Sequence, residues 1–239
     1  MFVAVDQPNY IPWKGYFDLI HDVDLFVFYS DVQYTTRDWR NRNVIRTPNG
    51  DKWLSVPCGK DTHRRIYEVN ITDHDWQKVH FETIKFAYGR APHYKWVEPL
   101  LTEVYLDRTW ENLVEMDRYL TERIARDFLG IKTEFADSRD YSTSGVKHER
   151  MLNLLKDIGA DAYLSGPAAR NYIIQEDYDD AAIKLRWKDY AGYPQYQQNG
   201  YTDFVHEVSI IDLLCNAGEE SPYYIWGWRE ENDHASWTE

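Results

Sequence analysis

The sequence predicts an α/β fold: a Rossmann-like, mostly parallel sheet core that carries a β-hairpin and a helical insertion. Three observations predict it. Strand and helix patterns alternate at both ends of the chain. An Asn-Gly pair joins two short runs of strand-forming residues. Residues 75–130 have the apolar spacing of helices. We therefore expect one α/β domain over residues 1–226, with 75–130 as the insertion and 227–239 as a partly ordered acidic tail.

The N-terminal part predicts strands around one short helix. Its apolar runs are rich in Val, Phe and Tyr, which favour strands. The stretch TPNGDK separates the two arms of the expected hairpin. In chain order, the patterns predict a strand at 2–5, a helix at 14–21, a strand at 24–29, hairpin strands at 44–45 and 53–56, and a strand at 65–71.

The middle of the chain predicts three helices. Apolar residues recur at three- and four-residue spacing from Trp76 to Ile84 and again over 110–128. The expected boundaries are Asp73 or Asp75 as the cap of the first helix, Pro92 and Pro99 on either side of a short second one, and Gly130 at the end of the third.

The second half returns to alternating strands and helices. We expect a strand at 132–136, a helix at 147–158 capped by Ser144, and a strand at 161–164. This last strand runs into SGPAARNY, a second turn of the strand-to-helix kind. Because strands at both ends of the chain then build one sheet, the helices in between form an insertion.

Charge and cysteine content exclude several classes of protein. A net charge of -13 argues against a surface that coats nucleic acid. Residues 35–65 are different, with eight Lys and Arg against three Asp, a local charge of about +5. That segment suits a confined anionic ligand, or else the solvated face of a hairpin. Two cysteines fit a reducing cytoplasm. No apolar run predicts a membrane span or a signal peptide.

Two strand-to-helix turns are unusually polar, and ligands of doubly wound sheets bind above such turns. The second turn places Ser165 and Gly166 before a helix whose first N–H groups suit a phosphate, with Arg170 one turn further on. The alternative for both is a stiff corner without a ligand. In the first, DQPNYIPWKGY, the candidate binding residues are Asp6, Gln7, Asn9, Tyr10 and Trp13, with Gly15 allowing close approach to the helix.

The loop DVQYTTRDWRNRN is rich in Arg and Asn, which present several fixed donors to phosphates, carboxylates and base edges. A salt-bridged surface loop is the alternative. The segment WKDYAGYPQYQQNGY adds Tyr193 and Gln195, which suit a sugar or a flat base, or equally a packed irregular segment. The candidate residues of the loop are Asp31, Gln33, Arg37, Arg40, Asn41, Arg42 and Asn43.

Several common catalytic motifs are missing from the sequence. It contains no HExxH, P-loop, G-x-G-x-x-G or G-x-S-x-G pattern. The histidines are scattered without metal-ligand spacing, so we predict no metal site and no cofactor. Cys58 has no His and acid pair at a suitable spacing, and we expect it to be a small buried residue.

Four stretches taken together resemble the WbqC-like family. They are QPNYIPWKGYFDLI, the arginine-rich loop running into TPNGDKWLSVPC, GADAYLSGPAARNY, and SIIDLLCNAG, and they cover about residues 3 to 218 in the family's order. One position departs from the family. Members commonly carry His directly before QPNY, where this chain has Asp6.

The resemblance implies a transferase. Members in O-antigen gene clusters are taken to act on nucleotide-linked sugars in surface-polysaccharide biosynthesis. Others resemble bacteriophage amino acid:DNA transferases, which attach an amino acid such as glycine, through its amine, to an activated 5-hydroxymethyl pyrimidine. In both settings a nucleophile displaces phosphate or pyrophosphate from an activated carbon.

The resemblance also implies roles for residues. Arginines with the Gly166 turn would stabilise the departing phosphate, with Arg42 counted as catalytic beside Arg37, Arg40 and Arg170. Asp6 or Asp31 would take the proton of the incoming ammonium.

We favour a DNA base as acceptor, specifically activated 5-hydroxymethyluracil in phage DNA, because ten Trp and 19 Tyr offer stacking surfaces for an extruded base. DNA contact would then be confined to residues 35–65, and a phage-encoded protein would act in the host cytoplasm. The alternatives are a nucleotide-sugar transferase and a non-catalytic module that binds a nucleotide or glycan.

Overall fold

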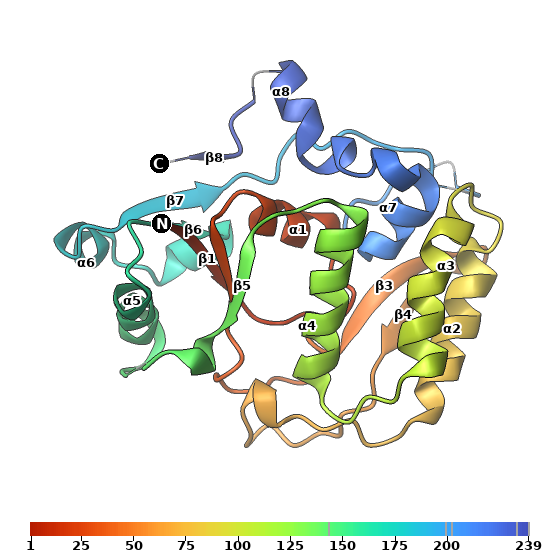
Figure 1. Ribbon diagram of the computed structural model, residues 1–239, viewed down its shortest axis with the longest axis horizontal. Helices are drawn as coiled ribbons and strands as arrows, with labels where there is room; N and C mark the ends of the chain where they lie inside the picture. The colour runs from red at the N-terminus through yellow and green to blue at the C-terminus, as the bar shows by residue number, and fades with distance from the viewer. Residues whose placement is uncertain (143, 199, 202, 233, 239) are drawn as a thin grey trace.

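The computed structural model describes residues 1–142, 144–198, 200–201, 203–232 and 234–238. Within these residues, six strands form one sheet and two form a separate hairpin (Figure 1). The α/β fold class is thereby confirmed. The sheet strands are β1 (Phe2–Asp6), β2 (Leu25–Phe28), β5 (Glu134–Asp137), β6 (Ala162–Ser165), β7 (Lys184–Lys188) and β8 (Trp237–Thr238), in the order β5-β2-β1-β6-β7-β8.

Five of these strands are parallel and lie between two apolar layers. β8 alone of the described sheet strands pairs antiparallel, with β7. Successive residues of β1 point to opposite faces, so Val3 and Val5 pack into one core and Ala4 into the other. Helix α1 (Lys14–His21) covers the second face, and α5 (Lys147–Ile158) covers the first (Figure 1). Burial on both faces explains why the strands are apolar runs rather than alternating patterns.

The strand order creates a crevice beside β1. The chain first moves from β1 to β2 and later continues on the opposite side of β1, through β6 to β7. In doubly wound sheets, the point where the order reverses leaves a gap at the carboxyl ends of the strands, and ligands bind there. Here that point lies between Asp6, the last residue of β1, and Ser165, the last residue of β6.

The hairpin forms where Asn-Gly predicts it. Strands β3 (Arg42–Thr47) and β4 (Gly50–Ser55) pair antiparallel, and Gly50 adopts the positive φ of 104° that the turn requires. The strand expected at 65–71 is wrong. That segment holds a short 3-10 turn, η1 (Ile66–Glu68), because the Glu68 carboxylate accepts the backbone N–H of Arg65 at 2.7 Å and closes the chain locally.

The insertion between the hairpin and β5 is helical. It consists of α2 (Asp75–Tyr88), α3 (Tyr94–Thr102), a π turn η2 (Glu103–Asp107), α4 (Leu113–Arg123) and a second π turn η3 (Ile124–Phe128). Pro99 lies inside α3 rather than after it. The long third helix starts later than expected because Asn112 caps α4, accepting from the N–H groups of Val114 at 3.0 Å and Glu115 at 3.2 Å.

The second alternating part has the predicted order. Helix α5 has the predicted bounds, but Ser144 is not its cap, because the helix begins after Val146 and no described side chain caps it. Ser144 instead accepts from Asn153 Nδ2. Between the strands lie three further elements: η4 (Ser138–Asp140), η5 (Pro167–Asn171) and α6 (Gln175–Asp180).

The C-terminal segment returns to the body of the protein. α7 (Ile210–Ala217), η6 (Gly218–Glu220) and η7 (Tyr223–Gly227) precede α8 (Trp228–Asn232). Residues 227–239, the expected acidic tail, include α8 and β8, and Trp237 packs edge-on against Phe2 at 5.4 Å between ring centres. Residues 233 and 239 of that tail lie outside the described residues. Over the described part of the chain, none of the helices has the length and apolarity to cross a membrane.

Candidate active site

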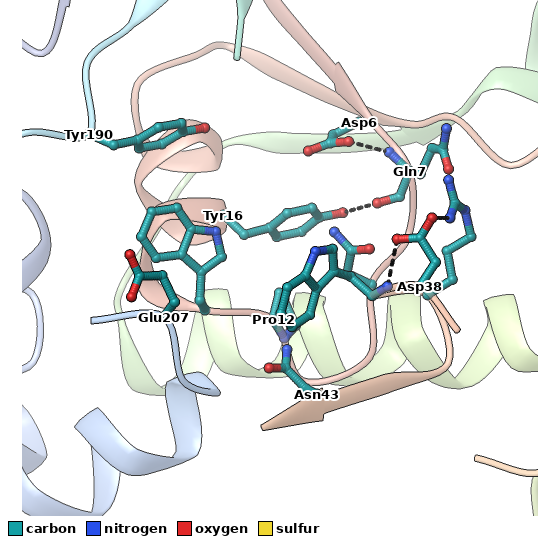
Figure 2. A pocket seen from close by; sticks show the side chains of 12 residues that line it. Asp6, Gln7, Pro12, Tyr16, Asp38, Asn43, Tyr190 and Glu207 are labelled. Carbon is teal, nitrogen blue, oxygen red and sulfur yellow. Dashed lines mark hydrogen bonds and ion pairs between the residues drawn. The ribbon is translucent and has the colours of Figure 1, made fainter. Parts of the chain in front are cut away.

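A cavity of about 440 Å³ lies at the crevice beside the carboxyl end of β1, a volume typical of small-molecule sites. Figure 2 shows Asp6 between Tyr190 and Gln7, above the ring of Tyr16. The walls of the cavity come from the turn after β1, the loop before β3, and the chain that follows β7. The lining residues are Asp6, Gln7, Asn9, Pro12, Trp13, Tyr16, Asp38, Trp39, Arg40, Asn43, Tyr190 and Glu207.

The turn after β1 is fixed by hydrogen bonds to Trp39, in the loop before β3, and to the side-chain amide of Asn43, in β3. The N–H of Tyr10 donates to the carbonyl of Trp39 at 3.0 Å. The Asn43 amide donates to the carbonyls of Tyr10 at 3.1 Å and Ile11 at 3.0 Å. Ile11 has a φ of +37°, an unfavourable value for a β-branched residue that these bonds hold in place. The turn is therefore a rigid corner and a wall of the cavity at once.

Trp13 forms the aromatic side of the cavity. Its indole packs against Tyr190 at 5.2 Å between ring centres. A Cβ added to Gly15 would lie 2.2 Å from this indole, so any larger residue there would displace the Trp13 ring. Gly15 thus makes room for the Trp13 ring, and close approach of a ligand to the helix at this glycine stays a prediction.

The Asp6 carboxyl group occupies the carboxyl end of β1. It is partly buried, and Oδ1 accepts the N–H of Gln7 at 2.7 Å. Tyr16 supports the same peptide by donating its hydroxyl to the Gln7 carbonyl at 2.9 Å. Burial raises the pKa of Asp6 to about 6, although the Gln7 N–H and the charge of Arg40 act in the opposite direction. Asp6 therefore changes charge close to neutral pH.

Asp38 and Arg40 form a charged pair in the same cavity. Arg40 pairs with Asp38 and donates to Thr35 Oγ1 at 2.6 Å, and Thr35 donates to Asp38 at 2.7 Å. Burial by itself raises the pKa of Asp38, but the hydrogen bond from Thr35 and the charge and hydrogen bond of Arg40 outweigh it and hold the pKa below its usual value. The pKa values of Asp6 and Asp38 are thus pushed apart, which is how active sites separate a proton acceptor from a permanent charge.

Two polar atoms of the lining residues lack a protein partner. Gln7 Oε1 and Arg40 Nε are buried, and neither has a hydrogen bond to any described residue. Buried polar atoms are normally paired, since an unpaired one costs about 1–3 kcal/mol. One acceptor and one donor from cavity-lining residues suit a ligand that presents both kinds of group.

A group of aromatic and cationic side chains lies beside the cavity. Trp39 lines the cavity and is 45% exposed, and its ring centre lies 5.4 Å from that of Trp53, which is 46% exposed. The Arg42 guanidinium lies over Trp53 at 4.2 Å from the ring centre. Exposed indoles of this kind are suited to stack a planar group.

Six of the residues predicted from the sequence line the cavity. Two others, Tyr10 and Asn41, have structural roles close to it. Tyr10 is fully buried and bonds to His80 Nδ1 at 2.8 Å and to Tyr105. Asn41 donates to the Val56 carbonyl at 2.9 Å. The six in the lining are Asp6, Gln7, Asn9, Trp13, Arg40 and Asn43.

The second turn differs from its prediction. SGPAARNY contains the 3-10 turn η5, not the start of an α-helix, and Pro167 has no N–H to offer a phosphate. Arg170 lies outside the cavity lining, where it donates to Thr238 Oγ1 at 3.0 Å and stacks on Trp187. Ser165 is buried. A Cβ on Gly166 would lie 3.9 Å from the Tyr190 hydroxyl, so the backbone of this turn stands next to the cavity wall.

The remaining predicted residues lie away from Asp6. Asp31 is buried in an ion pair with Arg150, and Gln33 lines a different groove. Arg37 is exposed, with its carbonyl accepting from Arg42, and Gln195 is exposed too. The Tyr193 hydroxyl donates to the buried Asp18.

Sequence reasoning did not single out several residues that shape the site. Tyr16 and Glu207 line the cavity. Tyr16 ends the stretch DQPNYIPWKGY but was not among its candidate residues, and Glu207 belongs to none of the quoted motifs. Behind the Trp13 wall, the buried Asp18 carboxylate binds Lys188 Nζ at 2.9 Å and Arg229 Nη1 at 2.7 Å. Lys188 and Arg229 each lie 170 or more residues from Asp18 in the chain, so no sequence spacing reveals this cluster. The apolar spacing of α1 carried a weak signal, since Asp18 lies on its buried face.

Fold and site together define an α/β protein with an acidic cavity at the switch point of a doubly wound sheet. The model of the WbqC-like protein family matches residues 7–224, so the chain belongs to that family, as its motifs predicted. It is also 43% identical over 225 residues to "Uncharacterized protein Rv1507c" of Mycobacterium tuberculosis (strain ATCC 25618 / H37Rv). That alignment covers 93% of this chain and 96% of the relative. No solved structure matches the chain significantly.

Proposed function

We propose that this chain is a transferase that joins an amine nitrogen to a phosphate-activated carbon, with Asp6 as the general base. One observation carries the proposal: the Asp6 carboxyl group faces a cavity at the switch point and has a pKa of about 6. An ordinary histidine has a pKa of about 6.5. The partly buried carboxyl thus has nearly the basicity of the histidine that similar proteins commonly carry directly before QPNY.

The proposed reaction is a displacement at the activated carbon. The substrate ammonium gives one proton to the Asp6 carboxylate and becomes an amine. Its nitrogen forms a bond to the methylene carbon of the acceptor while the carbon–oxygen bond to phosphate or pyrophosphate breaks. The leaving group departs with the bonding electron pair and takes the proton from Asp6. The carboxylate is restored, and the product is a secondary ammonium.

The charge of the cavity supports an amine substrate. Asp6, Asp38 and Glu207 contribute carboxyl groups against the single guanidinium of Arg40 among the lining residues. Such a cavity attracts an ammonium group. The unpaired Nε of Arg40 suits the carboxylate of a small amino acid such as glycine.

For the acceptor we favour activated 5-hydroxymethyluracil in phage DNA. A base that enters the cavity must leave its duplex, and enzymes that flip bases stack them on aromatic side chains. Trp39 and Trp53 supply an exposed indole pair beside the cavity. A sugar of a nucleotide-linked donor would use the same pair, so it is the second candidate acceptor.

Parallel transfer assays test the function. The chain is incubated with glycine and either a duplex containing pyrophosphorylated 5-hydroxymethyluracil or a uridine or thymidine diphosphate sugar, and the products are identified by mass spectrometry. We expect a glycine adduct on the base. An adduct only with the sugar would transfer the proposal to the second acceptor. Binding without product in every assay would identify a non-catalytic module.

Replacing the exposed indole is expected to weaken acceptor binding. Trp39→Ala removes a stacking partner, and base–aromatic stacking contributes about 1–3 kcal/mol. We expect the Kd for the modified oligonucleotide, measured by fluorescence anisotropy, to rise about tenfold. Trp237→Ala removes another exposed Trp, on β8, and serves as the matched control with an unchanged Kd. Equal effects of the two changes would exclude Trp39 as a stacking residue.

A further inference from the structure

A second hollow lies at the same end of the sheet as the acidic cavity, where the parallel strands have their carboxyl ends. It is a groove of about 710 Å³ between the residues after β2, the segment 62–68 and the start of α5. The loop 31–40 separates the two hollows. Its first residues, Asp31 to Gln33, line the groove, and its last residues, Asp38 to Arg40, line the cavity.

The groove has the opposite charge to the cavity. Its lining includes four cationic side chains, those of Arg64, Arg65, Lys147 and Arg150, against the carboxylates of Asp31 and Glu68. Asp31 is buried and forms an ion pair with Arg150, so its charge is offset inside the wall. Arg64, Arg65 and Lys147 then outnumber Glu68, and the groove is basic in a chain whose net charge is -13.

The arginines of the groove are held in position by the protein backbone. Arg64 donates to the carbonyls of Asp61 at 3.1 Å and Cys58 and stacks on Tyr34, with 5.2 Å from its guanidinium carbon to the ring centre. Arg65 donates one N–H to the Asp31 carbonyl at 3.2 Å and is otherwise exposed. Each guanidinium has five N–H groups, so both retain donors for a ligand.

Lys147 completes the cationic side of the groove. Its ammonium is exposed and has no ion-pair partner among the residues that the structure describes. Arginine forks and a lysine point charge are the groups with which proteins bind phosphate.

We propose that this groove binds the phosphate groups of a ligand. Electrostatic complementarity favours the groove over the acidic cavity for phosphates that take no part in the reaction. Three partly or fully exposed cations face the groove, and none of them has a paired carboxylate among the described residues. If the proposed transfer reaction is correct, these are nucleotide or backbone phosphates of the acceptor and not the leaving group, which stays bonded to the reacting carbon beside Asp6 until it departs. The binding claim itself does not depend on the reaction.

Charge reversal tests the site without any turnover. Calorimetry measures the Kd of inorganic pyrophosphate, a nucleoside diphosphate and a single-stranded oligonucleotide at low salt for the wild type, Arg65→Glu and Lys147→Glu. We expect each substitution to raise the Kd of the bound probe at least tenfold, and added salt to weaken binding. The probe with the lowest Kd distinguishes a free diphosphate, a nucleotide and a nucleic-acid backbone as the source of the phosphate.

Lys132→Glu is the matched control. Lys132 is exposed and precedes β5, at the amino end of the strands and away from the groove. Reversal of its charge changes the net charge of the protein as much as either groove substitution does. A rise in Kd as large for Lys132→Glu as for the groove variants would overturn the site, and so would no binding of any probe by the wild type. Asp6→Asn is expected to bind the probes normally. Loss of turnover with intact binding therefore separates a failed reaction from a failed site.

Discussion

Asp6→Asn is expected to lower the turnover number about 10²- to 10⁴-fold, the usual contribution of a general base. The substitution keeps the size of the side chain and removes its ability to take the ammonium proton. Because the Gln7 N–H contact needs only an oxygen, the turn after β1 should keep its geometry. Single-turnover kinetics and calorimetry on the same sample measure the two effects, with substrate Kd expected to change less than threefold.

Glu207→Gln is the control for Asp6→Asn, because it removes a negative charge from the cavity without removing the proposed base. It removes the same unit of negative charge from the same cavity, and we expect less than a tenfold fall in turnover. Equal losses for the two variants would mean that the cavity acts through its overall charge. Unchanged turnover in Asp6→Asn would remove Asp6 from the mechanism.

Lys188→Met is expected to lower the free energy of unfolding by about 3–5 kcal/mol, as removal of one partner from a buried ion cluster does. The Lys188 ammonium is fully buried between Asp18 and Asp22. Arg229 remains on Asp18, whereas Asp22 keeps His21 as its one ion-pair partner among the described residues. Urea unfolding monitored by tryptophan fluorescence measures the loss.

Lys184→Met is the control for this change, since Lys184 is exposed on the same strand β7. We expect less than about 1 kcal/mol from it. A Lys188→Met loss of the same small size would show that the cluster does not stabilise the fold.

The pH dependence of stability gives an additional check on the cluster. Burial by itself raises the pKa of Asp22, but hydrogen bonds from His21 and Lys188 outweigh it and lower the pKa below the ordinary value of 3.8. Stability from this group is therefore present above that value and lost as the pH falls through the folded-state pKa. The wild type should lose this contribution in acid, and Lys188→Met should lose less.

The cluster also bears on the site. Asp18 lies on α1, four residues beyond its first residue Lys14, and Trp13 and Tyr16 of the same segment line the cavity. Tyr193 binds Asp18 and follows the cavity residue Tyr190. The buried charges thus fix the aromatic wall from behind, and we class these residues as positioning groups.

A second buried carboxyl group does not compete with Asp6 for the role of base. Asp117 is fully buried, and burial raises its pKa well above the usual value. Its oxygens have no hydrogen-bond partner among the described residues, and it does not line the cavity. A substrate cannot reach it without unfolding part of the core, so it is a structural group.

Local sequence patterns predicted the elements that depend on interactions between residues close in the chain. The bounds of α1 and α5 follow from apolar spacing, and Asn-Gly located the hairpin. The rule that ligands bind above strand-to-helix turns pointed to the turn after β1, which begins with Asp6, and it left Asp31 as an equal candidate for the base.

Side-chain direction and long-range pairing could not be predicted in this way. Arg170 follows β6 closely in sequence, but its side chain turns to Trp187 and Thr238 instead of the cavity. Asp31 follows β2, but its carboxylate forms an ion pair with Arg150, which lies 119 residues later in the chain. The raised pKa of Asp6 depends on burial by several segments, and a sequence pattern carries no measure of burial.

The pH dependence of transfer tests the central claim most directly. The single-turnover rate of the wild type, measured from pH 4.5 to 8.5, should rise through about pH 6 as Asp6 loses its proton and then level off. Asp6→Asn should show no such rise. A wild-type rise near pH 4, or the same rise near pH 6 in Asp6→Asn, would contradict Asp6 as the base.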